Sequence, residues 1–288
     1  MGGEMLLLAA GLLGSFVVVP LNATSALIAG LEGVAVEARW DGAAEWEPLV
    51  ELAGVRHEVV ERDSRWLGGE LRCGEELRRW EAGPPFEEWT PIPVDGGLLL
   101  VQTTEVTNQQ YLTFARATGR DPAPDLGFPG MRGYARNFPE HPAVHVSFFD
   151  ARAYCRWRGH ELDAADALRL PSGAEWERAA LGVREVGRGG ALFTGPRAGG
   201  VNGDDVSRWG VRDLGGNVAE WCVDRVDGME HGATVVRRMI RGGSWDGAGA
   251  MGDNRSGSRS HFAIEQGRFS TVGFRPVWRI DLPGEGGS

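Results

Sequence analysis

The sequence predicts an α+β protein with a β-rich N-terminal part. Three observations lead to this prediction. Residues 1–90 contain short β-like runs broken by glycines and acidic turns. A Gly-Pro-Pro break follows at residues 83–85, and three helix starts come in a row after residue 91.

Composition indicates a globular chain with ample material for a core. The chain has 288 residues, 42% of them apolar, and 11 tryptophans, enough for one large domain or two ordinary ones. All 30 basic residues are arginine, which suggests a GC-rich bacterial genome and a hot habitat. The net charge of -10 argues against binding that relies on phosphate neutralisation, so we expect no nucleic-acid partner.

The apolar run between residues 5 and 19 raises the question of a signal peptide or membrane span. It is preceded by Glu4 and by no arginine or lysine, unlike a secretory signal. It is also short for a span and contains Gly11 and Gly14. We therefore expect a buried strand or strand pair and no membrane span, and the cytoplasm is slightly favoured.

The first 90 residues carry no motif that indicates a role. Strand-like runs lie at residues 16–20, 34–39 and 55–60. Residues 74–81 predict a short helix. The domain boundary is placed near residue 90, so that a second domain spans residues 91–281 and a Gly-rich tail spans residues 282–288.

The three helix starts share the pattern S/T-x-x-E/Q/D, in which two side chains satisfy free amide donors at a helix N-terminus. Aromatic residues follow each start at the spacing of a short amphipathic helix, and aromatics so placed usually belong to the core. The starts are Thr107 with Gln110, Ser147 with Asp150, and Ser172 with Glu175.

Several ordered motifs carry a family resemblance. They are residues 105–111 (EVTNQQY), 144–157, 170–177 (LPSGAEWE), 215–221 (GGNVAEW), 241–245 (RGGSW), 254–259 (NRSGSR) and 273–275 (GFR). This text resembles the formylglycine-generating enzyme family, the sulfatase-modifying factors, a branch of the C-type lectin fold. The resemblance covers roughly residues 95–281 and implies an α+β, C-type-lectin-like domain of that type over residues 91–281.

The chemistry of this family's oxidases requires cysteines. The resemblance implies a pair of cysteines five residues apart, the second of which directly follows an arginine. The soft sulfur atoms of such cysteines select Cu(I), and one cysteine also engages the substrate thiol. The matching positions here are Met251 and Ser256. We therefore expect no catalysis and no copper, and we interpret Cys155 and Cys222 as buried structural residues.

Residues 213–220 place two carboxylates around a glycine turn, and calcium prefers such mixtures of carboxylate and carbonyl oxygens at roughly 2.3 to 2.6 Å. The resemblance implies a structural calcium site formed by the side chains of Asp213 and Glu220 and the carbonyls of Gly216 and Val218. The alternative is that Glu220 and Asn217 only bond backbone amides in a buried turn.

The four-residue spacing of His141 and His145 resembles a metal pair, and another branch of the superfamily uses a three-histidine iron site. Pro142 and the β-like text of residues 143–146 argue against a shared helix face. We therefore expect no iron site there.

Between Trp245 and Gly273, small, polar and aromatic residues follow no clean period, which suits a loop-rich binding face held by rigid anchors. The segment resembles the variable region of retroelement-diversified proteins, in which random replacement of template adenines yields a limited set of residues. The expected contact residues all belong to that set: Asp246, Gly247, Gly249, Ser258, Ser260, His261, Phe262, Phe269, Ser270 and Thr271.

The sequence thus predicts non-catalytic recognition of a protein or other macromolecule through this C-terminal groove, with aromatic residues supplying contact area and hydroxyls supplying hydrogen bonds. The alternative is an oxidase of the formylglycine-generating type, or a related protein-modifying enzyme, with an altered active site. A third interpretation is an ordinary divergent surface loop without a ligand.

Overall fold

The computed structural model describes residues 89–95, 97–124, 126–162, 167–183, 194–201, 203–230, 233–246 and 261–281, together with residue 45 and the backbone of seven strands between residues 16 and 81. By internal contacts the chain divides into two compact units. One comprises residues 1–100, 160–164 and 279–288, and the other comprises residues 101–159 and 165–278.

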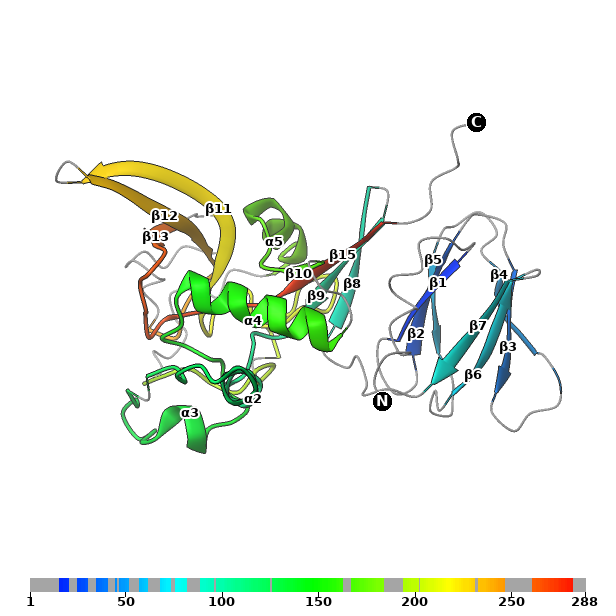
Figure 1. The fold of residues 1–288 in the computed structure, drawn as a ribbon, viewed down its shortest axis with the longest axis horizontal. Helices are drawn as coiled ribbons and strands as arrows, with labels where there is room; N and C mark the ends of the chain where they lie inside the picture. Colours follow the sequence, from blue (N-terminus) through cyan, green and yellow to red (C-terminus); the bar gives the residue numbers. More distant parts are fainter. Residues whose placement is uncertain are drawn as a thin grey trace. The chain divides into compact units, whose positions relative to one another are not determined.

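The N-terminal part is β-rich, as predicted, and forms two antiparallel sheets (Figure 1). The strands of the first sheet, in spatial order, are β1 (Phe16–Pro20), β2 (Ser25–Gly30) and β5 (His57–Glu61). Those of the second are β4 (Glu47–Glu51), β3 (Ala35–Trp40), β6 (Gly68–Cys73) and β7 (Glu76–Glu81).

The predicted helix at residues 74–81 is wrong. Strand β7 occupies residues 76–81 and pairs antiparallel with β6 from Gly68↔Glu81 to Cys73↔Glu76. An isolated helix of this length is marginal because its costly first turn is followed by few hydrogen bonds. Pairing with β6 instead provides partners along the whole segment, so the neighbouring strand overrides local propensity.

A four-stranded sheet brings the beginning and the end of the predicted lectin-like domain together. Its spatial order is β10 (Leu168–Arg169), β15 (Val277–Asp281), β9 (Gly97–Gln102) and β8 (Trp89–Val94). All residues of β9 are buried, which explains its uninterrupted apolar run. The backbone N–H of Gln102 donates to the carbonyl of Pro276 (3.1 Å) just beyond this sheet.

The predicted helix starts are confirmed. The helices are α2 (Asn108–Thr118), α3 (Tyr134–Asn137), α4 (Phe148–Glu161) and α5 (Gly173–Ala179). Thr107 with Gln110 and Ser172 with Glu175 form complete capping boxes. Ser147 and Asp150 exchange the same kind of bonds before α4. No described helix has the length and apolar character needed to cross a membrane.

The core lies where α2 and α4 pack on the first residues of β11, in another four-stranded sheet of this domain. Phe114 meets Tyr154 edge-on at a centroid distance of 5.6 Å, and Tyr154 meets Phe274 at 5.3 Å. The strands of that sheet, in spatial order, are β13 (His261–Ile264), β12 (Ala233–Arg241), β11 (Ala219–Glu230) and β14 (Val272–Gly273). Figure 1 shows the long curved hairpin of β11 and β12 extending beyond the helices.

Candidate functional site

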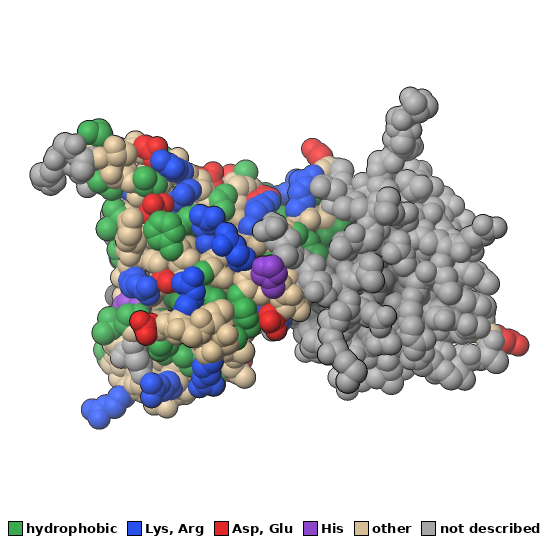
Figure 2. Space-filling view, in the orientation of Figure 1, with side chains coloured by type: hydrophobic (Ala, Val, Ile, Leu, Met, Phe, Trp, Pro, Cys, Tyr) green, Lys and Arg blue, Asp and Glu red, His purple; other side chains and the backbone are tan. Residues whose placement is uncertain are grey.

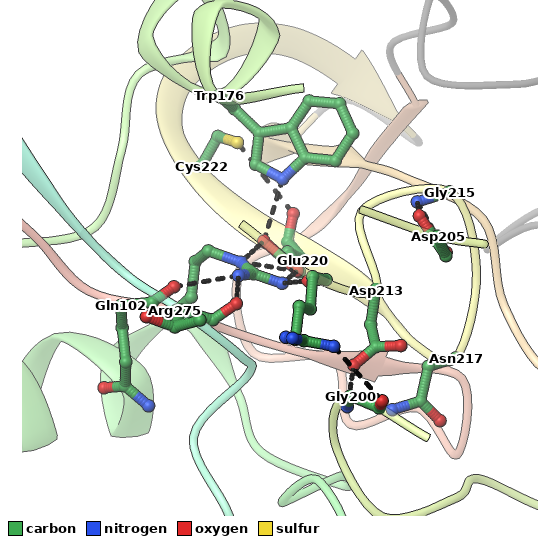
Figure 3. A network of polar contacts seen from close by, with 12 residues as sticks. Gln102, Trp176, Gly200, Asp205, Asp213, Gly215, Asn217, Glu220, Cys222 and Arg275 are labelled. Carbon is green, nitrogen blue, oxygen red and sulfur yellow. Dashed lines mark hydrogen bonds and ion pairs between the residues drawn. The ribbon is translucent and has the colours of Figure 1, made fainter. Parts of the chain in front are cut away.

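A buried ion pair anchors the site. Glu220 lies near the start of β11, and Arg275 follows β14; their side chains are 1% and 0% exposed. Arg275 Nη2 lies 2.7 Å from Glu220 Oε1, and Nε donates to both carboxylate oxygens at 2.9 Å (Figure 3). The indole N–H of Trp176 donates to Glu220 Oε2 at 2.8 Å, so α5 joins the same contact.

The remaining donors of Arg275 bind backbone carbonyls. Nη1 reaches the carbonyl oxygens of Gln102 (2.8 Å) and Thr103 (3.1 Å), and Nη2 reaches that of Arg212 (2.9 Å). Every N–H of the guanidinium therefore has an acceptor. The motif at residues 273–275 thus connects three parts of the domain through Arg275: β9, the turn that contains Arg212, and β11.

Three more carboxylates are buried around this pair. Asp213 accepts the backbone N–H of Gly200, and Asp205 accepts that of Gly215 at 2.9 Å. Glu105 is 1% exposed, and neither of its carboxylate oxygens has a hydrogen-bond partner within the part of the chain that the structure describes. Burial, with the nearby negative charges adding to it, raises the pKa of Asp205 to about 6 and that of Glu105 well above its usual range.

Of the predicted calcium residues, Asp213, Gly216 and Val218 lie on a turn in which Asp213 and Asn217 have positive φ angles of 61° and 58°, and Glu220 lies on β11. Glu220 gives both carboxylate oxygens to Arg275 and Trp176 rather than to backbone amides. Among the described residues, no group of three or more His, Cys, Asp or Glu side chains could hold a metal ion. Calcium at this turn therefore stays a prediction.

The predicted binding segment falls partly outside the description. Gly247, Gly249, Ser258 and Ser260, as well as Met251 and Ser256, lie outside the described residues. The described contact residues are all partly exposed: Asp246, His261, Phe262, Phe269, Ser270 and Thr271.

The side chain of Trp245 brings two stretches of this segment together. The backbone N–H of Trp245 donates to the carbonyl of Asn217 (2.7 Å), and its indole N–H donates to the carbonyl of Ser270 (3.1 Å). Asp246 therefore lies near residues 269–271. Strand β13, which carries His261 and Phe262, is placed separately by its pairing with Ile240 and Met239 of β12.

Phe269 has a packing role in addition to its predicted contact role. Its ring lies 6.1 Å from that of Trp221, which is fully buried, and it packs against the main hydrophobic cluster. The carbonyl of Phe269 accepts the backbone N–H of His145 at 2.9 Å. This residue is therefore partly a core residue, which alternation along the sequence did not reveal.

Sequence reasoning missed an aromatic group beside Trp245. The Phe128 ring meets Trp245 edge-on at a centroid distance of 5.4 Å and stacks on His145 at 6.5 Å. The β-like text at residues 143–146 is not a strand, because His145 takes a positive φ of 58° there. The histidine motif itself was visible, but its position beside Phe128 depends on contacts between distant segments.

The described cysteines are inert by position. Cys155 on α4 is 2% exposed and Cys222 on β11 is 0% exposed. Burial raises the pKa of both thiols, which disfavours the reactive thiolate. The third cysteine is Cys73, so no cysteine lies anywhere beyond residue 222.

The domain consists of capped helices that pack on short sheets, and a buried arginine holds the sheet of β13, β12, β11 and β14. This arrangement defines an α+β protein with the C-type-lectin-like fold of the formylglycine-generating enzyme type. The chain belongs to the family of the sulfatase-modifying factor enzyme 1-like domain, whose model matches residues 67–191 and 192–280.

Among its relatives, the formylglycine-generating enzyme of Streptomyces coelicolor is 29% identical over 278 residues, covering 70% of this chain and 83% of that protein. The inactive C-alpha-formylglycine-generating enzyme 2 of Bos taurus is 32% identical over 176 residues, 53% of this chain and 50% of that protein. The chain thus spans half the length of the bovine relative. The structure of Treponema denticola variable protein 1 aligns with a TM-score of 0.43 and 22% identity, covering 63% of this chain and 84% of that one.

Proposed function

We propose that this protein is a non-catalytic ligand-binding protein that presents a variable C-terminal face on a C-type lectin scaffold, in the manner of retroelement-diversified variable proteins. The face comprises the segment between Trp245 and Gly273. Its partner is a protein or another macromolecule.

The observation that carries this proposal is the distribution of cysteines. An oxidase of the family type needs a thiolate pair that can bind Cu(I) and engage a substrate thiol. All three cysteines precede residue 223, so no shift of the motif alignment can supply one between Trp245 and Gly273. Cys155 and Cys222 are buried in the core and cannot substitute for that pair.

The geometry of the anchors also supports a binding role. Trp245 is fixed by two hydrogen bonds, and strand β13 resumes at His261 in register with β12. Residues 247–260 are therefore bracketed by two positions that the scaffold holds firmly. A binding face of this kind can change its residues while the fold that presents it stays intact.

One relative supports the separation of scaffold from chemistry. The bovine protein that matches about half of this chain is named as an inactive formylglycine-generating enzyme. A member of the family is therefore named as inactive. A non-catalytic role for the present chain is in line with that name.

The test is nucleotide sequencing of this locus from several isolates, with a search downstream for a near-copy of the segment that encodes residues 245–275. A copy that differs only where it holds adenines would establish a diversified binding protein, and the mismatches would identify its variable positions. Identical residues in every isolate, with no copy, would rule diversification out.

A second candidate is a protein-modifying enzyme with an altered active site, which the 29% identity to the Streptomyces coelicolor enzyme over 83% of its length favours. The two candidates are separated by incubating the purified protein with Cu(I) and a cysteine-containing peptide and measuring formylglycine by mass spectrometry. The Streptomyces enzyme serves as the positive control. Any formylglycine formed above the copper-only background would overturn the non-catalytic proposal.

A further inference from the structure

His145 adopts a backbone conformation that a residue with a side chain rarely takes. Its φ angle is 58°, in the left-handed region that favours glycine and asparagine. Two contacts hold it there: its backbone N–H donates to the carbonyl of Phe269 at 2.9 Å, and its carbonyl accepts Arg268 Nη1 at 3.0 Å. Strained residues of this kind persist where the surrounding structure imposes them, and they concentrate at functional sites.

The side chain of His145 lies beside the predicted binding segment. Its neighbours Val144 and Val146 are buried, whereas His145 is partly exposed. Its ring stacks on that of Phe128 at 6.5 Å, and Phe128 in turn meets Trp245 edge-on at 5.4 Å. Since Trp245 opens the predicted binding segment, His145 is next to that segment in space although it is distant in the sequence.

The imidazole of His145 has hydrogen-bonding capacity that the described part of the chain does not use. Neither ring nitrogen forms a hydrogen bond with a described residue. Burial, and then the positive charge of Arg268, lowers the pKa of His145 from its ordinary value. The ring is therefore neutral at pH 7, with one N–H donor and one nitrogen acceptor. This combination complements a peptide group, which offers one carbonyl and one N–H.

The surroundings of the imidazole suit an apolar side chain next to such a peptide group. Phe128 and Trp245 are both partly exposed, and both pack against a buried cluster that includes Tyr134 and Val218. On the face of this domain that Figure 2 shows, hydrophobic side chains lie among arginines and carboxylates. Aromatic side chains that a core holds in place and polar groups surround are typical of the residues that contribute most to protein interfaces.

We propose that His145 is a ligand-binding residue of the C-terminal face, and that together with Phe128 and Trp245 it receives a peptide segment of a protein partner. His145 hydrogen-bonds a backbone group of that segment, and the two aromatic rings contact an adjoining apolar side chain. Phe128 and His145 lie outside residues 245–273, so they form a fixed part of the face. This inference rests on the proposed ligand-binding function and specifies protein as the class of partner.

The test uses the full chain and a microarray of immobilised random-sequence peptides, on which binding of the fluorescently labelled protein is measured. The variant is His145→Asn. The control is His160→Asn, which makes the same change at an exposed histidine on α4. The melting temperature of each protein is measured as well.

We expect the wild type and His160→Asn to bind the same peptides with equal affinity. His145→Asn should bind those peptides at least about tenfold more weakly, because a side chain in contact with the ligand is lost. Its melting temperature should equal or exceed that of the wild type, because asparagine takes a positive φ more readily than histidine. A residue that only packs would lose stability on the same change, so the melting temperature separates the two roles.

Unchanged peptide binding in His145→Asn would overturn the proposal, and so would weaker binding that comes with a lower melting temperature. A wild type that binds no peptide on the array would also overturn it, while the proposed function is decided separately by sequencing of the locus. Should His145→Asn fail to fold, His145→Gly replaces it, because glycine takes a positive φ without strain. If neither variant folds, His145 is a structural residue and the proposal is wrong.

Discussion

Glu220 and Arg275 form a bidentate ion pair in which neither side chain is more than 1% exposed. The pair joins the start of β11 to the residue after Phe274, and Arg275 also donates to the carbonyls of Gln102 and Arg212. It lies close to one end of the proposed binding face, because the neighbouring pairs Ala219↔Val272 and Glu220↔Gly273 fix the end of the C-terminal segment. This contact therefore connects the stability of the fold to the position of the segment that ends at Gly273.

Removing one partner of this pair should be strongly destabilising. Glu220→Gln removes the carboxylate that is hydrogen-bonded to the buried guanidinium of Arg275, for which the expected loss is roughly 3–5 kcal/mol of unfolding free energy. The measurement is urea unfolding followed by tryptophan fluorescence. Asp227→Asn, which breaks the exposed pair with Arg225, is the control and should leave the midpoint unchanged. Equal losses in the two variants would contradict the assignment of Glu220 and Arg275 as the anchor.

The two phenylalanines predicted to contact ligand should behave differently. Phe269→Ala should cost roughly 2 kcal/mol, below the 3–5 kcal/mol typical of fully buried aromatic residues, because its ring packs on Trp221 but is partly exposed. Phe262→Ala, on the outer strand β13, should change stability by less than about 0.5 kcal/mol. Chemical denaturation of both variants checks this. A large loss of unfolding free energy in Phe262→Ala would assign Phe262 to the core and count against the proposed binding face.

Cys155 and Cys222 should resist alkylation in the folded protein. Burial raises the pKa of both thiols and also blocks access of the reagent. Iodoacetamide treatment at pH 8 followed by peptide mass mapping should show modification of these two residues only after denaturation. Rapid labelling of either residue under native conditions would reopen the enzymatic alternative.

Asp205 should make the domain less stable as the pH rises. Its folded pKa of about 6 lies above the usual value of 3.8, so its protonated form is favoured in the native state. That contribution to stability is fully present below about pH 4 and is lost as the pH rises through 6. In buffers with chelator, Asp205→Asn should therefore gain melting temperature relative to the wild type from pH 4 to pH 7. A difference that stays constant over this range would show that Asp205 titrates normally.

The local parts of the fold were predictable from the sequence. Capping boxes depend on residues three apart, so Thr107 and Ser172 identified the starts of α2 and α5 without knowledge of the rest of the chain. The strand β7 was not predictable in this way, since residues 76–81 take their conformation from pairing with β6. Phe269 was assigned to the surface for a similar reason, because its contact with Trp221 is between distant segments.

The sequence by itself determined the family, the positions of the helix starts and the lack of any cysteine beyond residue 222, because each of these is a property of residue identity and short-range spacing. Only the tertiary structure decided that Glu220 pairs with Arg275 and that the Glu105 carboxylate is buried without a hydrogen-bond partner among the described residues. Arg275 also binds the carbonyl of Gln102 across 173 residues of chain. Charge compensation in a core depends on which groups are brought together after the chain has folded, and spacing along the sequence carries no record of it.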